Sequence, residues 1–320
     1  MACPSDLTHC GMYDGAPALF ARGIIPSMNT PFLYDSAIDG EGIRRSVDAA
    51  VDAGVAGLLV LAVAGETASL GQTERRLATS TFLDQVAQRV PVIVGCSSAR
   101  QEQRVASAAM ARELGADAML CQAPPDLHGA ALVAQMDALV RVGPPVLMVQ
   151  DLDFAGPGLP FADILALRQH IPAFRCLKIE VALPGPKYTA VLEATRGALH
   201  VSGGWAAAQM MEALHRGVHA FIPTAMDTIY VEIFRRFAAG DAAAARALHA
   251  RLMPVLAFSN QHIDISIRFF KHLRQREGLF QTAVCRAGVA ELDAHQMREL
   301  QIILDRVIEL QDELKSPSRP

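Results

Sequence analysis

The chain has 320 residues, of which 51% are hydrophobic and 19% are charged, so it can build a large core. Its net charge of -4 at pH 7 argues against a nucleic-acid partner or binding to an anionic membrane surface. No apolar run reaches the roughly 18 residues that cross a bilayer, and the first residues lack the features of a secretory signal. The six cysteines form no C-x-x-C pair, and Cys96, Cys121 and Cys176 lie in apolar strand-like runs, which is the pattern of a reducing compartment, so we expect a cytoplasmic protein.

The chain repeats one unit, in which a short apolar run is followed by a polar or glycine-containing turn and an amphipathic stretch. Such runs indicate buried strands and such stretches indicate helices. We predict strands at 23–30, 56–63, 91–97, 118–123, 145–151, 174–180, 198–203 and 220–225. Helices are predicted near 40–54, 72–89, 100–115, 128–142, 161–170, 186–195, 206–216 and 228–239. Eight strand–helix units favour an α/β fold of the (β/α)8 TIM barrel type over a doubly wound sheet, which usually has fewer strands.

The pattern changes after residue 240, where no further strand is needed. Asp241 is suited to cap a helix at Ala242–Phe258, and two more helices are predicted at about 260–276 and 292–314. We therefore expect three parts, which are an N-terminal extension (1–20), the barrel (21–240) and a C-terminal helical extension packed on it (241–320).

Lys178 is one of only four lysines and lies inside an apolar run that is predicted to be the sixth strand. Strand alternation places Phe174, Cys176, Lys178 and Glu180 on one face, which we take to point into the barrel. An isolated lysine of this kind is usually solvated on an edge strand, but strands of a parallel barrel are buried on both faces. Burial favours the neutral amine of a lysine, and that amine is a nucleophile suited to Schiff-base formation with a 2-oxo acid.

The ends of the predicted strands carry a recognisable series of motifs. They are Thr30-Pro31-Phe32, Gly65-Glu66-Thr67-Ala68-Ser69-Leu70 with Glu74-Arg75, Pro91 to Gly95, Gly115-Ala116-Asp117, Leu177-Lys178, Ser202-Gly203 and Gly240-Asp241. In this order the chain resembles the dihydrodipicolinate synthase / N-acetylneuraminate lyase family over about residues 22 to 310. The resemblance implies a barrel with a Schiff-base lysine, a 2-oxo acid such as pyruvate as substrate, no metal or other cofactor, and a homo-oligomer, either a dimer or a tetramer.

Several positions depart from the family pattern. The best-known members have two threonines before the Gly-Glu of strand 2, where this chain has Val63 and Ala64. Aligning strand 5 places Val149 where those members carry a proton-donating tyrosine. The usual hydroxyl relay is therefore absent, which argues against dihydrodipicolinate synthase activity. The chain is more similar to the branch that acts on 2-oxo-3-deoxy sugar acids, which includes 2-oxo-3-deoxypentonate dehydratases.

Glu180 is the nearest candidate to move protons, because it is two residues from Lys178 on the same strand face. A carboxylate there can take a proton from C3 of the iminium while a hydroxyl leaves C4, which is a dehydration. An ion pair that keeps Lys178 charged and inert is an equally good interpretation of the same spacing. The residues that we expect to bind substrate lie at the ends of four strands and are Val63, Ala64, Gly65, Val149, Gly203 and Ile222.

Other polar residues near the strand ends have simpler interpretations. We expect Glu66 to brace the loop after strand 2, and His128 to be a surface or helix-start residue. Asp151 either shares the barrel lumen or caps a loop. No metal site is expected, because no histidine pair has a nearby acidic partner.

Three functions stay open. The first is a Schiff-base lyase in which dehydration is favoured over aldol cleavage. The second is a ligand-binding homologue that kept the barrel and lost turnover along with the Tyr/Thr relay. The third is a phosphate-binding barrel that uses Gly203-Gly204, which ranks last because no basic residue lies on that loop.

Overall fold

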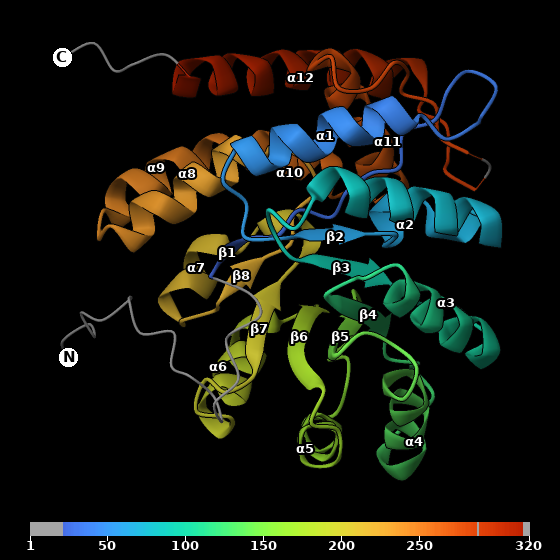
Figure 1. Ribbon diagram of the computed structural model, residues 1–320. Helices are drawn as coiled ribbons and strands as arrows, with labels where there is room; N and C mark the ends of the chain where they lie inside the picture. Colours follow the sequence, from blue (N-terminus) through green and yellow to red (C-terminus); the bar gives the residue numbers. More distant parts are fainter. Residues whose placement is uncertain (1–21, 287, 316–320) are drawn as a thin grey trace.

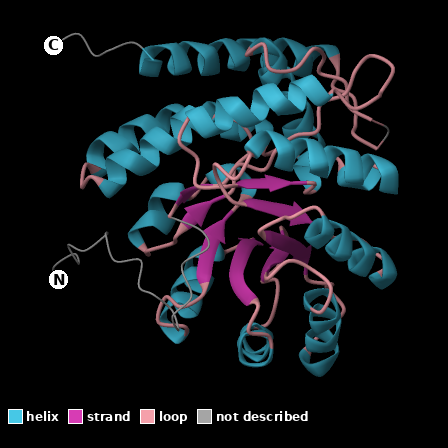
Figure 2. Ribbon diagram, viewed as in Figure 1, coloured by secondary structure: helices cyan, strands magenta, loops and turns pink. Residues whose placement is uncertain are grey.

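The computed structural model describes residues 22–286 and 288–315, and the predicted N-terminal extension at 1–20 lies outside them. A ring of parallel strands forms the centre of the molecule and helices surround it (Figure 1, Figure 2). The strands are β1 (Gly23–Ile24), β2 (Leu58–Val60), β3 (Val92–Gly95), β4 (Ala118–Gln122), β5 (Val146–Asp153), β6 (Phe174–Val181), β7 (His200–Gly203) and β8 (Ala220–Phe221). Their order in the sheet is β1-β8-β7-β6-β5-β4-β3-β2, so sequential strands are neighbours.

The two ends of this sheet meet and close the barrel. The Met28 N–H donates to the Leu59 carbonyl at 2.8 Å, and the Leu59 N–H donates to the Pro26 carbonyl at 3.0 Å. Ser27 forms a parallel bridge with Leu59. These bonds confirm the predicted (β/α)8 barrel.

The first and last strands are shorter than predicted. Regular pairing covers two residues in β1 and two in β8, where the sequence suggested 23–30 and 220–225. Pro26 and Pro223 follow these strands closely, and proline has no N–H to extend a ladder. The chain therefore leaves the sheet early on both sides of the closing seam.

Eight helices alternate with the strands. They are α1 (Gly40–Asp52), α2 (Gln72–Val86), α3 (Gln101–Glu113), α4 (Gly129–Val140), α5 (Phe161–His170), α6 (Pro184–Ala194), α7 (Met210–His215) and α8 (Asp227–Ala238). Short 3-10 turns that the sequence did not indicate follow β2 and β7, at η1 (Val63–Gly65), η2 (Thr67–Ser69) and η3 (Trp205–Ala207). The η3 turn explains why α7 begins at Met210 and not at residue 206 as predicted.

The C-terminal part is helical, as predicted, but the expected helix Ala242–Phe258 is broken in two. It forms α9 (Ala242–Arg251) and α10 (Met253–Ser259), because Pro254 cannot donate a hydrogen bond back into α9 and instead stands at the start of the next helix. The helices α11 (Ile263–Arg276) and α12 (Ala294–Lys315) follow, and α11 contacts η1 above the carboxyl ends of the strands (Figure 1). No helix in the described part of the chain is long and apolar enough to span a bilayer.

The apolar core has two layers, one inside the barrel and one between strands and helices. The inner cluster contains side chains of seven strands or their extensions, which are Ile25, Leu59, Ala62, Ile93, Ala118, Leu120, Val146, Met148, Cys176, Ala220 and Ile222. Phe174 belongs to the outer cluster and does not share the face of Cys176 as predicted. The register between β5 and β6 shifts at this point, and the extra residue turns Phe174 outward.

Candidate active site

Lys178 lies near the carboxyl end of β6 and extends into the barrel above the inner cluster. Cys176, two residues earlier on the same face, is a member of that cluster. Parallel pairing places Gln150 of β5 on one side of Lys178 and Ser202 of β7 on the other. The Lys178 side chain is only 6% exposed, so its amine is almost removed from bulk water.

Glu180 is the direct partner of Lys178. The Lys178 Nζ lies 2.8 Å from Glu180 Oε2, and the Glu180 side chain is also 6% exposed. The same Oε2 accepts a hydrogen bond from Gln150 Nε2 at 2.6 Å, while Oε1 accepts from the Trp205 N–H at 2.8 Å. Three donors from three strand ends thus fix the position of the carboxylate beside the amine.

The loop after β7 is shaped to hold Glu180. A Cβ at Gly204 would collide with the Glu180 carboxylate, so only glycine leaves room for it there. Trp205 has a left-handed backbone conformation (φ 54°), which aims its N–H at the carboxylate. Its indole packs on Phe154 from the loop after β5, with the ring centroids 4.3 Å apart.

A narrow cavity of about 60 Å³, which we call the lysine chamber, contains Lys178 and Glu180. Three hydroxyl-bearing side chains also face it, from Ser27, Thr224 and Ser266. Its other lining residues are Ala62, Val63, Ala64, Gln150, Leu152, Phe154, Trp205, Ile222 and Ile263. The chamber therefore combines one amine, one carboxylate and several hydroxyl groups within a largely apolar wall.

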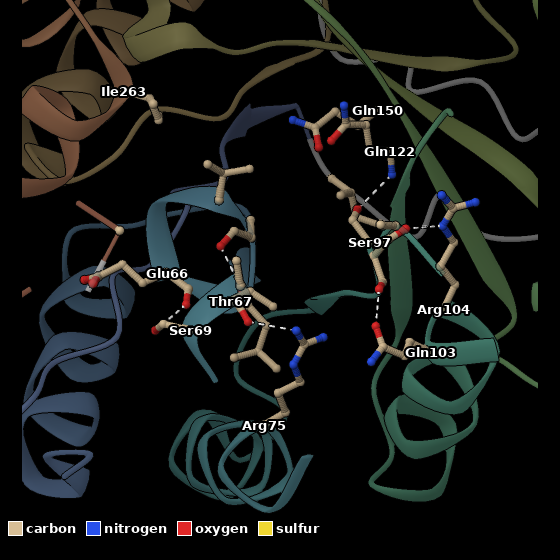
Figure 3. A pocket seen from close by; sticks show the side chains of 18 of the residues that line it. Glu66, Thr67, Ser69, Arg75, Ser97, Gln103, Arg104, Gln122, Gln150 and Ile263 are labelled. Carbon is tan, nitrogen blue, oxygen red and sulfur yellow. Dashed lines mark hydrogen bonds between the residues drawn. The ribbon is translucent and has the colours of Figure 1, made fainter. Parts of the chain in front are cut away.

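The lysine chamber adjoins a larger cavity of about 600 Å³, which we call the arginine cavity (Figure 3). The two share Ala62, Val63, Gln150 and Ile263 in their linings. Figure 3 shows Gln122 beside Gln150 near one end of the arginine cavity and Arg75 bonded to Thr67 near the other. A substrate attached to Lys178 thus has room to extend past Gln150.

Some of the residues that were predicted to bind substrate line the lysine chamber, and the others lie outside its lining. Val63, Ala64 and Ile222 line the lysine chamber. Gly65 is the buried last residue of the η1 turn, and its carbonyl accepts a hydrogen bond from Thr30 Oγ1 at 2.7 Å. Gly203 is required for packing, since a Cβ there would come 2.8 Å from the Tyr188 hydroxyl.

The placement of Val149 as a substrate-binding residue was wrong. Val149 is fully buried in the outer cluster and pairs with Leu177, which also faces outward. Because side chains alternate along a strand, the lumen position belongs to its neighbour Gln150, which pairs with Lys178. Counting alternate residues from Met148 would have identified Gln150 from the sequence.

Asp151 and His128, the other titratable residues near the strand ends, have structural partners outside the lysine chamber. Asp151 forms an ion pair with Lys187 and accepts from the Leu159 N–H at 2.7 Å, so it caps the loop after β5. Burial raises the pKa of Asp151, and its bonds with Lys187 and Leu159 oppose that rise. His128 stands before α4, with its Nδ1 2.8 Å from Asp163 Oδ2.

Glu66 joins the loop after β2 to the C-terminal helices. It forms a buried ion pair with Lys271 of α11 and accepts from the Arg286 N–H at 2.7 Å. This position agrees with the bracing role expected for it. Ser27, Thr224 and Ser266 were not singled out from the sequence, because isolated hydroxyl residues carry no spacing signal.

Comparisons with known proteins agree with this geometry. The model of the dihydrodipicolinate synthetase family matches residues 20–307. The chain is 39% identical over 103 residues to 4-hydroxy-tetrahydrodipicolinate synthase of Salinibacter ruber, covering 32% of this chain and 34% of that protein. It is 35% identical over 166 residues to L-2-keto-3-deoxyarabonate dehydratase of Azospirillum brasilense, covering 50% and 53%. The aligned segments thus span about a third to a half of these curated relatives.

Solved structures share the fold over almost their whole length. The sialic acid aldolase of Ruminococcus gnavus superposes with a TM-score of 0.83 at 17–18% identity, covering 92% of this chain and 98–99% of that chain. A dihydrodipicolinate synthase from Rhodopseudomonas palustris gives a TM-score of 0.80 at 20% identity, covering 89% and 97%. At these identities the likeness establishes the barrel and its C-terminal helices.

Proposed function

The chain belongs to the dihydrodipicolinate synthetase family, and from this premise we propose that it is an aldolase-type lyase that forms a Schiff base through Lys178. We propose a 2-oxo-3-deoxy sugar acid as its substrate, for example a 2-oxo-3-deoxypentonate, and dehydration as its reaction. The observation that carries the proposal is the 2.8 Å contact between Lys178 Nζ and Glu180 Oε2 inside the buried lysine chamber.

Glu180 gives Lys178 a way to become a nucleophile. The ammonium group transfers one proton to the Glu180 carboxylate, and the neutral amine attacks C2 of the 2-oxo acid. The carbinolamine then loses water, with the proton returned by Glu180. The products of this stage are a protonated Schiff base on Lys178, one water molecule and an ionised Glu180.

The same carboxylate can then catalyse the elimination. The iminium withdraws electrons from C3, so Glu180 removes a C3 proton and forms an enamine. The enamine expels the C4 hydroxyl, which leaves as water with the proton held by Glu180. A second water molecule hydrolyses the conjugated iminium and releases the 2-oxo-3-enoic acid, which restores Lys178.

The backbone of the loop after β2 is the proposed site for the substrate carboxylate. The N–H groups of Gly65 and Glu66 already donate to the Ala62 and Val63 carbonyls, both at 3.0 Å. Those of Val63 and Ala64 precede these bonds in the 3-10 turn, as the first N–H groups of a helical turn do. Both residues line the lysine chamber, so their N–H groups are our candidates to bind a carboxylate next to the Schiff base.

Product analysis tests the reaction type. Incubation with each enantiomer of 2-oxo-3-deoxypentonate should yield 2,5-dioxopentanoate, the tautomer of the dehydrated acid, and Lys178→Met should yield none. Formation of pyruvate and glycolaldehyde would show cleavage of the C3–C4 bond and would replace dehydration by aldol cleavage. Absence of any product, together with substrate-dependent thermal stabilisation that survives in Lys178→Met, would identify a binding protein.

Binding without turnover is the second candidate because of the same ion pair. If Glu180 holds Lys178 as an ammonium group in the presence of substrate, the amine cannot attack a ketone. We also propose a cytoplasmic homo-oligomer, a dimer or a tetramer, which light scattering after size-exclusion chromatography would measure.

A further inference from the structure

The arginine cavity is too large to serve only as an entrance to the lysine chamber. Its volume is about 600 Å³, ten times that of the chamber, and it contacts the chamber through Val63 and Gln150. Amide and hydroxyl side chains make up much of its polar lining, namely Ser69, Ser97, Ser98, Gln103, Gln122 and Gln150. Two arginines from different helices complete it (Figure 3).

Arg104 of α3 is a buried cation whose hydrogen-bond acceptors are all neutral. It is 8% exposed, and its guanidinium donates to the Ser98 carbonyl, to Gln101 Oε1 and to Gln135 Oε1, the last at 2.8 Å. Across residues 22–286 and 288–315, no carboxylate forms an ion pair with it. Its positive charge is therefore oriented by the protein but not neutralised by it.

Arg75 of α2 also lines the cavity and also donates only to neutral acceptors, but it is partly exposed. Its guanidinium donates to the Leu70 carbonyl at 3.1 Å and to the Thr67 carbonyl at 2.8 Å. Partial burial lowers the pKa of Arg75, and none of the described carboxylates forms an ion pair with it. Neighbouring arginines differ, since Arg76 pairs with Glu113 and Arg286 pairs with Glu74.

Two acidic side chains also line the arginine cavity, and both are engaged elsewhere. Glu66 is paired with Lys271. Asp264 Oδ2 accepts from the Ala290 N–H at 3.2 Å and lies 3.6 Å from His262 Nδ1. Neither contact of Asp264 neutralises its carboxylate, because a backbone N–H carries no net charge and His262 is charged only when protonated. The two guanidinium groups therefore face one carboxylate, which leaves an excess of one positive charge in the cavity.

A guanidinium group that has lost water and has no anionic partner is costly, and an anion that binds between two such groups offsets the cost. Arginine is well suited to this role, because its planar fork matches the oxygens of carboxylates and phosphates. Both arginines line the larger cavity, which shares Gln150 with the lysine chamber, so the part of a substrate that extends past Gln150 enters the cavity that contains them.

We propose that the arginine cavity binds an anionic group at the end of the substrate remote from the ketone, either a carboxylate or a phosphate ester, through Arg75 and Arg104. This inference rests on the proposed Schiff-base function and narrows it. Among 2-oxo-3-deoxy sugar acids, those with a second anionic end would then bind more tightly than 2-oxo-3-deoxypentonate, whose tail is neutral.

Borohydride trapping with matched probes tests this inference. Each 2-oxo diacid from 2-oxoglutarate to 2-oxosuberate is compared with the 2-oxo monoacid of the same carbon number, and the 6-phosphate ester of 2-oxo-3-deoxygluconate is compared with the unesterified acid. For at least one pair we expect half-maximal trapping at a concentration about tenfold lower for the doubly anionic probe, the size of one charge-assisted hydrogen bond. The pair that shows the preference distinguishes carboxylate from phosphate.

Arg104→Gln should remove the preference, and Arg104→Lys should retain part of it because the charge remains. Arg100→Gln is the matched control, since Arg100 stands directly before the same helix, is exposed and is outside the lining of the cavity. Trapping of the monoacids reports whether each variant still forms the lysine chamber. Equal trapping within every pair would overturn the inference and leave the proposed function intact, whereas no trapping with any probe or with pyruvate would overturn both.

Discussion

Lys178 and Glu180 are two residues apart on β6, and the alternation of a strand is sufficient to bring their charged groups together. What the strand alone does not supply is the orientation of the carboxylate. That orientation comes from the Gln150 amide and the Trp205 N–H, which reach Glu180 from the two neighbouring strands. The proposed proton acceptor is thus held by groups that are distant in the sequence.

Replacement of Glu180 by glutamine should lower the turnover number by about 100-fold or more, because an amide cannot accept the proton from Lys178 or from C3. The measurement is the steady-state rate of 2,5-dioxopentanoate formation. Glu193→Gln, an exposed acid on α6, serves as the control. A Glu180→Gln enzyme with normal turnover would exclude Glu180 as the base.

Replacement of Gly204 by alanine should disturb Glu180 without altering any charge. The Gly204 backbone is extended (φ -128°), so alanine is tolerated by the main chain and only the new Cβ meets the carboxylate. We expect turnover to fall on the order of 10- to 100-fold, the effect of a misplaced catalytic group. In the control Gly71→Ala, the new Cβ has an ordinary 3.7 Å contact with Glu74. Normal turnover in Gly204→Ala would argue against a catalytic need for this position of Glu180.

The lysine and its acidic neighbour were predictable from the sequence, but the residue of β5 that lies beside them was not predicted correctly. Lys178 and Glu180 followed from alternation within one strand. Val149 was chosen by alignment to a family tyrosine, and the structure shows that Gln150 occupies the lumen at that level. No sequence pattern indicates that the backbone N–H of Trp205 donates to Glu180.

The helix α11 packs over the carboxyl ends of the strands and contacts the η1 turn. Lys271 of this helix is fully buried, forms an ion pair with Glu66, and lies 4.0 Å from the centroid of the Phe32 ring. Its Nζ also donates to the Val284 carbonyl at 2.8 Å. One side chain thus connects the C-terminal helices to the loop that lines both cavities.

Replacement of Lys271 by methionine should reduce the free energy of unfolding by about 3–5 kcal/mol, because Glu66 is left as a buried charge without its partner. Urea denaturation measures the change. The matched control is Arg276→Met on the same helix, whose pair with Asp305 is about half exposed, and its effect should be much smaller. Equal effects in the two variants would show that burial of the Lys271–Glu66 pair does not determine its contribution.

The order and type of these elements were predictable, and several of their ends were not. Periodicity indicated the helices after residue 240, but Pro254 divides the predicted helix at 242–258. The 3-10 turns η1 and η3 were missed because three-residue turns carry no periodic signal. They are the turns that bring Val63 and Trp205 to the lysine chamber.

The whole barrel brings distant segments to one end, and its strand count was correctly predicted because each strand has its own apolar run and turn. The closing seam between β1 and β2 was not predictable in detail, since it depends on the bonds of Pro26, Met28 and Leu59. Titratable groups that the proposed chemistry does not use lie at the amino ends of the strands. His219 is one of them, and its ring stacks on His200 with centroids 5.1 Å apart.

The stability of the barrel should decrease as the pH falls below 6.5. Burial, with His200 and Arg22 as smaller causes, lowers the pKa of His219 from 6.5 to about 3. The unfolded chain therefore binds a proton below pH 6.5 that the folded chain binds only near pH 3, so this group destabilises the fold by up to about 1.4 kcal/mol for each unit between these values.

Urea denaturation across this pH range measures the slope. His219→Asn keeps an acceptor for the Val201 N–H but does not titrate. It should therefore lower the slope of the unfolding free energy against pH by the contribution of one proton, about 1.4 kcal/mol per pH unit. The exposed His215→Asn serves as the control. An unchanged slope in His219→Asn would show that His219 is not the group responsible.

The central claim is that Lys178 forms a Schiff base with a 2-oxo acid. The most direct measurement is mass spectrometry of the peptide that contains Lys178 after incubation with pyruvate and reduction by borohydride. We predict that this peptide gains the mass of a reduced pyruvyl adduct, that Lys187, Lys271 and Lys315 do not, and that Lys178→Met shows no adduct. Absence of an adduct on Lys178 with pyruvate and with 2-oxo-3-deoxypentonate, in a folded protein, would contradict the claim.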